Sequence, residues 1–378
     1  MNITMNRLLL AATVLVVSGL LSGAMNSTSE VHAAQSSCAV VNLTTGTGPT
    51  ANAQRAIDHA GAGNQLRVRG VCQGHVTVKK DLTIVGKTTR AWPQPTLDPT
   101  VHGCDAHCFV VRVSGGADTQ LTLRDIKLTH GNRAHGGGGI YIKGASVTLR
   151  GSTWITGNYA LWFGGGIYLS EDYKDGQVVL RGQSLVSGNS ARDGGGGIFG
   201  NDIVLHGHST VSENSTKHTA GGIRGNVVMK DHSEVLSNTS RSSGGILGTV
   251  TMRDFSRVCE NTVQYASAGG IGGSVTMWDN ATVCNNTSSG RDERSNSGGG
   301  IAGTVVMHGH ASVVGNLAHD NGGGVWCSPG SHVTLNDSAT ISGNTADTDG
   351  GGVFNDCAAV TLNDNSSITQ NTPNDIAP

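Results

Sequence analysis

The chain has 378 residues, of which 57 are glycine and only five each are Trp, Tyr and Phe, so a globular core built on aromatic residues is excluded. Lys and Arg total 25 against 27 Asp and Glu, which leaves no basic footprint for nucleic acid or for a membrane surface. Seven prolines and the lack of a G-X-Y period exclude collagen and proline-rich disorder, and the composition favours stacked repeats of short strands.

The N-terminus has the pattern of a bacterial export signal. Arg7 precedes an apolar run from Leu8 to Leu21, and small residues around Ala33 offer a cleavage site. The run is shorter than the roughly 20 residues that span a bilayer. We therefore expect a signal peptide at 1–33, no transmembrane segment after its removal, and a protein that is secreted, extracellular or held at the cell surface.

Residues 34–135 are predicted to form an N-terminal cap and the first irregular coils of a stack. The stretch 49–64 places Ala53 and Ile57 at helical spacing and ends at Gly61, which indicates a short amphipathic helix. Such a helix would cover the open end of a repeat stack, as solubility requires.

The segment "HGGGGI" at residues 135–140 has the form of an oxyanion-hole loop of a hydrolase. However, the G-x-S-x-G motif of such an enzyme is missing from the chain, and the glycine motif recurs at spacings of 23 to 31 residues. A structural corner is needed in every repeat, whereas a catalytic loop is needed once, so a hydrolase of the lipase or esterase kind is excluded. Glycines run into Ile140, Ile167, Ile198, Ile223, Ile246, Ile271, Ile301, Val325 and Val353.

Each glycine corner is followed by a strand of alternating pattern and then by an asparagine. In "SVTLRG" Val147 and Leu149 are expected to point inward, and Thr148 and Arg150 outward. Three short strands per repeat predict an all-β fold: a single-stranded right-handed parallel β-helix, a solenoid of the pectin-lyase-like kind, over 136–371, with a tail at 372–378. The Asn residues are predicted to form a capping amide ladder, and the Asp or Gly residues before them tight turns. The ladder comprises Asn158, Asn189, Asn214, Asn238, Asn261, Asn286, Asn316, Asn344 and Asn371.

Eight cysteines in an exported chain indicate disulfides. Cys259 and Cys284 occupy one position of neighbouring repeats, so stacking would place them about 4.8 Å apart, within the bridging range of roughly 4.4 to 6.8 Å. Zinc is the rival interpretation, but no CxxC pair is present. The other expected pairs are Cys327 with Cys357, Cys104 with Cys108, and Cys38 with Cys72.

"GGGI" followed by "VxxN" resembles the GGAI and FxxN repeat of polymorphic outer membrane proteins, within the pectate-lyase-like superfamily. The resemblance covers about residues 136–371, although Val or Ile replaces the family's Phe. It implies surface display and adhesion, while the wider superfamily implies polysaccharide cleavage. The chain lacks the NTD, DD, GHG and RIK motifs of pectin hydrolases of this fold.

The outward residues before the Asp or Gly turn form a mostly basic column about 30 Å long, from six steps of about 4.8 Å. We predict that an acidic polysaccharide lies along it, with Trp278 as a platform for a sugar ring. The alternative is a solvated face on which long side chains cover strand edges. The candidate ligand-binding residues are Arg150, Arg181, Lys230, Arg253, Trp278 and His308.

The sequence thus favours a non-catalytic, adhesin-like protein that binds glycans or other surfaces. A polysaccharide lyase or glycoside hydrolase acting on acidic polysaccharide is the alternative, and a purely structural spacer is a third. His208 and His232 share an outward position, but two ligands without a third do not predict a metal site. No catalytic residue and no cofactor is predicted, and the oligomeric state stays open.

Overall fold

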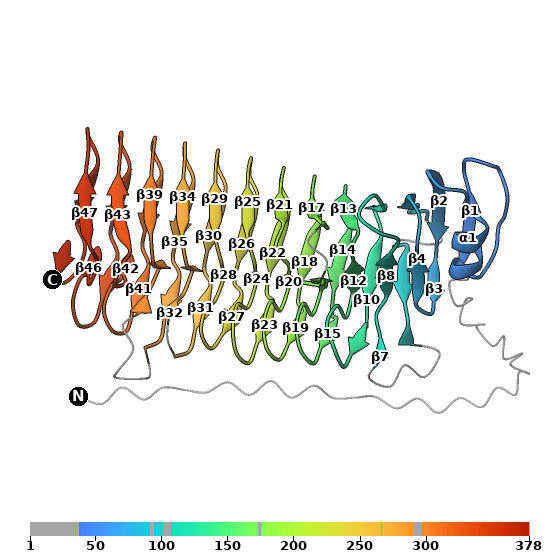
Figure 1. Cartoon of the computed structure of the whole chain (residues 1–378), viewed down its shortest axis with the longest axis horizontal. Coiled ribbons are helices and arrows are strands. Elements are labelled where there is room, and N and C mark those ends of the chain that lie inside the picture. Colours follow the sequence, from blue (N-terminus) through green and yellow to red (C-terminus); the bar gives the residue numbers. More distant parts are fainter. Residues whose placement is uncertain are drawn as a thin grey trace, which may run out of the picture. The chain divides into compact units, whose positions relative to one another are not determined.

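A computed structural model describes residues 38–377 apart from 91–93, 101–106, 173–174, 266 and 291–296. The predicted export signal at 1–33 lies outside the described residues. The described chain forms an all-β parallel solenoid whose coils follow one another in chain order (Figure 1). The predicted fold class is confirmed at this level.

Equivalent strands of successive coils pair in parallel to build four long sheets, named A to D. One regular coil runs through β12 (Ile140–Lys143) in sheet C, β13 (Ser146–Arg150) in sheet A, β14 (Trp154–Thr156) in sheet B and β15 (Tyr159–Ala160) in sheet D. The prediction of three strands per coil was therefore wrong by one. The sheet D strands of the regular coils are two residues long, too short to carry an alternating pattern of their own.

Sheet A has 13 strands and carries the candidate functional face. Its strands are β1 (Ala39–Asn42), β2 (Asn64–Arg69), β5 (Leu82–Gly86), β9 (Gln120–Arg124), β13, β17 (Val178–Leu180), β21 (Ile203–Leu205), β25 (Val227–Met229), β29 (Val250–Met252), β34 (Val275–Met277), β39 (Val305–Met307), β43 (His332–Leu335) and β47 (Ala359–Leu362).

Sheet C has 12 strands and adjoins sheet A in each coil. Its strands are β4 (Val76–Val78), β8 (Val111–Ser114), β12, β16 (Ile167–Leu169), β20 (Ile198–Phe199), β24 (Ile223–Arg224), β28 (Ile246–Leu247), β33 (Ile271–Gly272), β38 (Ile301–Ala302), β42 (Val325–Cys327), β46 (Val353–Asn355) and β49 (Ile376–Ala377).

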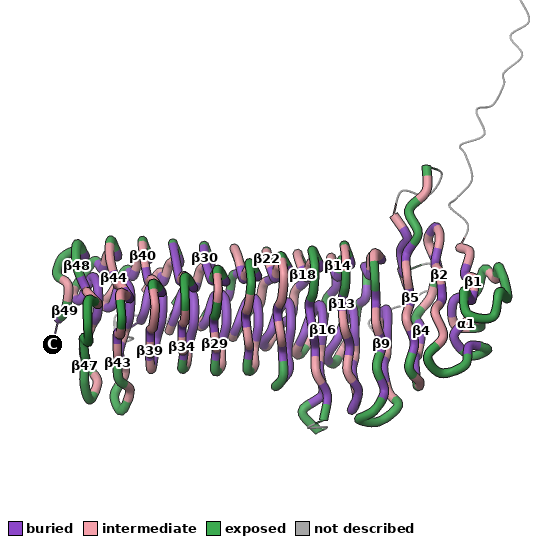
Figure 2. The backbone as a smooth tube through the Cα atoms, turned by 90° about the horizontal axis from the view of Figure 1, so that it is seen from above, coloured by how far each residue is buried: buried purple, intermediate pink, exposed green. Residues whose placement is uncertain are grey.

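The core is a column of aliphatic side chains inside the coils, as the alternating pattern predicts. Buried residues recur in coil after coil along the stack (Figure 2). Val147 and Leu149 are fully buried, whereas Thr148 between them is half-buried and points outward. The partners of these three residues in the next coil are Val178, Leu180 and Val179. Because the same pattern recurs in each coil, side chains of the same type pack on each other along the stack.

The repeated glycines lie where coils approach too closely for a side chain. A Cβ atom at Gly245 would lie 2.6 Å from the carbonyl oxygen of Gly270 and 2.9 Å from Nδ2 of Asn261. Real Cβ atoms do not tolerate such contacts with backbone. The glycine motif is therefore a corner of the solenoid.

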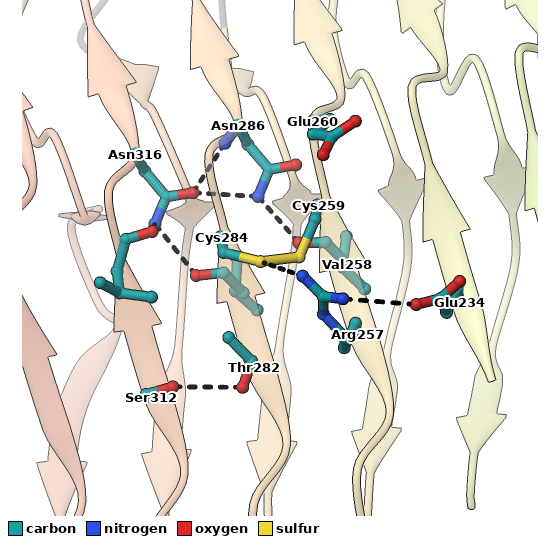
Figure 3. The surroundings of a disulfide bond; sticks show 12 residues. Glu234, Arg257, Val258, Cys259, Glu260, Thr282, Cys284, Asn286, Ser312 and Asn316 are labelled. Carbon is teal, nitrogen blue, oxygen red and sulfur yellow. Dashed lines mark hydrogen bonds and ion pairs between the residues drawn. A yellow bond between two sulfur atoms is a disulfide. The ribbon is translucent and has the colours of Figure 1, made fainter. Parts of the chain in front are cut away.

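The predicted asparagine ladder is confirmed. Asn286 is fully buried; its Nδ2 donates to Asn316 Oδ1 of the next coil at 2.9 Å and to the Val258 carbonyl oxygen of the preceding coil at 2.9 Å (Figure 3). Its main-chain N–H also donates to Asn316 Oδ1. The amides from Asn158 to Asn344 repeat this pattern, and Asp375 Oδ1 takes the place of the next Asn for Asn371. The ladder thus satisfies buried polar groups from coil to coil.

Three of the predicted disulfides are confirmed. Cys259 and Cys284 bridge β30 (Arg257–Cys259) and β35 (Thr282–Cys284) of sheet B, with their Cα atoms 4.6 Å apart (Figure 3). The corresponding separations are 4.5 Å for Cys38–Cys72 and 5.2 Å for Cys327–Cys357. Cys108 is also disulfide-bonded, but Cys104 lies outside the described residues, so its pairing with Cys108 stays a prediction.

The predicted N-terminal helix is present as α1 (Ala53–His59). The side chain of Asn52 accepts a hydrogen bond from the N–H of Arg55, and Ala53 and Ile57 are buried. β1 pairs with β2 in the antiparallel sense, unlike the long run of parallel strands that follows in sheet A. None of the helices in the described part of the chain is long and apolar enough to cross a membrane.

Candidate functional site

The outward side of sheet A presents three parallel columns of side chains, which we call the sheet A face. One residue of each column comes from each coil, so neighbours in a column are about 4.8 Å apart. The first column is polar, the second β-branched and the third mostly basic. The polar column contains Gln120, Ser146, Gln177, Asp202, Asn226, Thr249, Ser274 and Thr304.

The middle column contains only Thr and Val between β9 and β47. The pairing register aligns these residues without a break, and all but Val179 are at least partly exposed. The short β-branched side chains of the middle column project less far from the sheet than the long side chains on either side. The column comprises Thr122, Thr148, Val179, Val204, Val228, Thr251, Thr276, Val306, Thr334 and Thr361.

The third column is the basic column predicted from the sequence, and the structure places its members in one line. Arg124 pairs with Arg150 in the register, and the main-chain N–H groups of the later members donate to the preceding coil at equivalent positions. In the part of the chain that the structure describes, four cations of the column form no ion pair: Arg150, Arg181, Lys230 and Arg253. Their role in ligand binding stays a prediction.

The turn after the column contains either Gly or Asp, and the Asp carboxylates bind backbone. Asp231 has a φ of 57°, and its Oδ2 accepts a hydrogen bond from the N–H of Gly207 at 2.8 Å. This hydrogen bond is the main reason that the pKa of Asp231 lies below its ordinary value. The predicted structural role of the turn residues is thus confirmed.

These carboxylates also make the positive potential of the basic column differ from one coil to another. Arg181 is followed by Gly182, whereas Lys230 and Arg253 are followed by Asp231 and Asp254. The turn after Arg150 also holds a carboxylate, since Asp125 Oδ1 accepts from the N–H of Ser152. A carboxylate beside a cation lowers the positive potential that a second anion meets. The strongest attraction for an anionic ligand is therefore expected at Arg181.

Trp278 is enclosed by its neighbours in the column. The imidazole of His308 stacks on the indole at 3.9 Å between centroids, and the guanidinium carbon of Arg253 lies 5.2 Å from the indole centroid. Since Arg253 and His308 belong to the preceding and following coils, they cover opposite ring faces. The edge of the indole, and not a free face, is what a ligand would meet.

His206 is a partly buried member of the basic column. Burial and the neighbouring Arg181 lower the pKa of His206, and the Asp231 carboxylate 3.6 Å from Nδ1 opposes this shift. The neutral imidazole is therefore favoured near neutral pH. His206 therefore adds little positive charge to the sheet A face under those conditions.

Sequence reasoning missed a second outward ladder, on sheet C. Tyr141, Tyr168 and Phe199 stack along the axis with centroids 5.7 and 5.4 Å apart. The guanidinium carbon of Arg133 lies 3.9 Å from the Tyr141 centroid, and that of Arg224 lies 5.2 Å from the Phe199 centroid. Desolvation lowers the pKa of Arg133 and raises that of Tyr168. The residue after each GGxI motif is the sequence signal that locates this ladder.

His208 and His232 lie at the same position of adjacent coils, as predicted. Their rings stack at 5.0 Å, and Phe255 continues the stack at 5.0 Å. Among the described residues, no group of three His, Cys, Asp or Glu side chains lies close enough to hold a metal ion. The two histidines are thus part of an aromatic stack on the turns between sheets A and B.

Comparison of the chain with models of known protein families, with curated proteins and with solved structures gave no match.

Proposed function

We propose that this protein is an exported binding protein for acidic polysaccharides, which lie along the sheet A face without being cleaved. The three aligned columns of this face carry the proposal. Aliphatic and hydroxyl-bearing side chains in the middle suit a sugar ring. The amides, hydroxyls and single carboxylate on one side can bond its hydroxyl groups, and unpaired cations on the other side can bind carboxylates.

The repeat of the solenoid supports a polymeric ligand. The sugar units of a linear polysaccharide repeat at about the length of one pyranose ring. This repeat distance is similar to the spacing of about 4.8 Å between coils. Each sugar can therefore meet the same three kinds of side chain. A polymer with one carboxylate per residue matches the face better than a compact ligand does.

Export and family membership belong to the same proposal. Three disulfides are typical of a protein that folds in an oxidising compartment, and the pattern at 1–33 resembles a bacterial signal peptide. The repeats resemble those of polymorphic outer membrane proteins in the pectate-lyase-like superfamily. We infer that the protein acts outside the cell or at its surface.

The test mixes residues 34–378 with a polyuronate, and in parallel with the methyl-esterified polymer, and follows polymer size by size-exclusion chromatography. Earlier elution of the polyuronate with protein in the same fractions is expected. Weaker binding of the ester is also expected, because its carboxylates are neutral. Later elution of polymer would show cleavage and would replace binding by a lyase or hydrolase activity.

The site is tested by the double variant Arg150→Gln, Arg181→Gln. Exposed ion pairs contribute about 0.2 to 1 kcal/mol each, so the affinity should fall by about 2- to 30-fold. A matched control removes two exposed cations outside the face, Lys217→Gln and Arg241→Gln, and should retain wild-type affinity. Equal losses in both variants would show that binding follows net charge and not the sheet A face.

A further inference from the structure

A cleft of about 480 Å³ lies between helix α1 and the first strands of sheet C. Its volume is in the range of small-molecule sites, roughly 300 to 1,000 Å³. It lies on a different sheet from the sheet A face. Its lining residues are Gln54, Ile57, Asp58, Thr77, Lys79, Lys80, Arg112 and Ser114.

The helix wall of the cleft is held in place by hydrogen bonds to β4. Gln54 Oε1 accepts from the N–H of Thr77 at 2.6 Å, and Gln54 Nε2 donates to the Thr77 carbonyl oxygen at 3.1 Å. Gln54 Nε2 also donates to Oδ1 of Asp58 at 2.7 Å. The wall is therefore formed before any ligand binds, which lowers the entropic cost of binding.

Three cations meet at this cleft, the consecutive residues Lys79 and Lys80 after β4 and Arg112 from β8. Lys80 is anchored, since its Nζ donates to the carbonyl oxygens of Asp58 at 3.1 Å and Ala60 at 2.6 Å. Lys79 is exposed, and Nε of Arg112 is buried without a hydrogen-bond acceptor among the described residues. Because Nε is closed off, the two Nη groups of Arg112 are the donors that a ligand in the cleft can reach.

The charges of the lining do not balance. Lys79, Lys80 and Arg112 face a single carboxylate, Asp58, among the described lining residues, which leaves an excess of two positive charges. A phosphate monoester carries about −1.5 to −2 charges at pH 7, whereas a carboxylate carries one. The guanidinium fork of Arg112 also suits bidentate binding of a phosphate group.

We propose that the cleft between α1 and sheet C binds a phosphate group, either free or as part of a sugar phosphate. Arg112 donates to two phosphate oxygens, and the ammonium groups of Lys79 and Lys80 neutralise the remaining charge. The Ser114 hydroxyl, on the same outward side of β8 as Arg112, is placed to donate a further hydrogen bond. Binding at this site does not depend on the polysaccharide proposed for sheet A.

Isothermal titration calorimetry of residues 34–378 at constant ionic strength tests the proposal, with sodium phosphate and sodium acetate as probes. Saturable binding of phosphate is expected, with acetate at least about tenfold weaker because it lacks the second charge. A hexose phosphate in a further arm distinguishes the sources. Equal affinity identifies the phosphate group alone as the ligand, and tighter binding shows that the sugar also contacts the cleft.

Two variants locate the site. Arg112→Gln should weaken phosphate binding by about tenfold or more, because charged hydrogen bonds are lost. Lys79→Gln changes an exposed side chain and keeps the test valid if the Arg112 variant does not fold; a loss of about 2- to 5-fold is expected. Lys217→Gln serves as the control. Acetate binding as tight as phosphate binding, or phosphate affinity unchanged in both cleft variants, would overturn the proposal.

Discussion

Replacement of Asn238 by alanine removes one member of the asparagine ladder in the middle of the stack. The side chain is fully buried and makes four hydrogen bonds. Its Nδ2 donates to the Val211 carbonyl oxygen and to Asn261 Oδ1, both at 3.0 Å. Its Oδ1 accepts from the main-chain N–H and from Nδ2 of Asn214, both at 3.0 Å.

The expected loss follows from these four bonds. Each is worth about 1 kcal/mol net, and a buried donor left without a partner costs about 1 to 3 kcal/mol. The main-chain N–H of Asn214 loses its acceptor in the variant. We therefore expect Asn238→Ala to lower the free energy of unfolding by about 3 to 5 kcal/mol.

Amide hydrogen exchange is the suitable assay, because coils of a solenoid contact only their neighbours and can open locally. Exchange should accelerate in the coils on either side of Asn238 and much less at the distant ends. Asn280→Ala is the control, since Asn280 is an exposed turn residue and its loss should stay within about 0.5 kcal/mol. A loss below about 1 kcal/mol for Asn238→Ala, or one equal to the control, would refute the structural role of the ladder.

Three further perturbations test other parts of the fold. Replacing both Cys259 and Cys284 by serine opens a link between positions 25 residues apart and should cost about 2 to 4 kcal/mol in urea unfolding; an unchanged midpoint would contradict this. Burial lowers the pKa of His206 in the folded state, so the folded protein disfavours the protonated ring. The stability that the neutral ring contributes is fully present above about pH 6.5 and is lost as the pH falls through the folded pKa. His206→Gln should flatten the decline in stability between pH 7 and 5, and an identical pH profile would argue against this assignment. Gly245→Ala places a Cβ 2.6 Å from a carbonyl oxygen of the next coil, so circular dichroism should show loss of the native β signal; a wild-type spectrum and melting temperature would refute the close packing.

Much of the fold could be predicted because one pattern repeats. A glycine pair, two inward aliphatic residues and an asparagine recur with only small changes in spacing. Residues at equal positions must then stack, so Cys259 could be paired with Cys284 and the Asn side chains with one another. The two-residue strands such as β15 were missed, since a strand of that length has no period to detect.

The candidate sites were less predictable, because outward side chains obey no burial pattern. The sequence placed Arg253, Trp278 and His308 in one line, but only the side-chain packing showed that the flanking residues cover both faces of the indole. The polar column of the sheet A face went unnoticed, since its members share hydrogen-bonding capacity and no single residue type. The aromatic ladder of sheet C was missed for the same reason.

The sequence by itself determined the register of the stack, the inward and outward faces, and the pairing of Cys259 with Cys284, because each of these follows from translating one repeat along one axis. Only the tertiary structure decided which charges remain free. It showed which turns beside the basic column hold Asp carboxylates, and that Arg112 meets Lys79 and Lys80 beside α1. Such meetings depend on the packing of a helix and irregular coils that no repeat encodes.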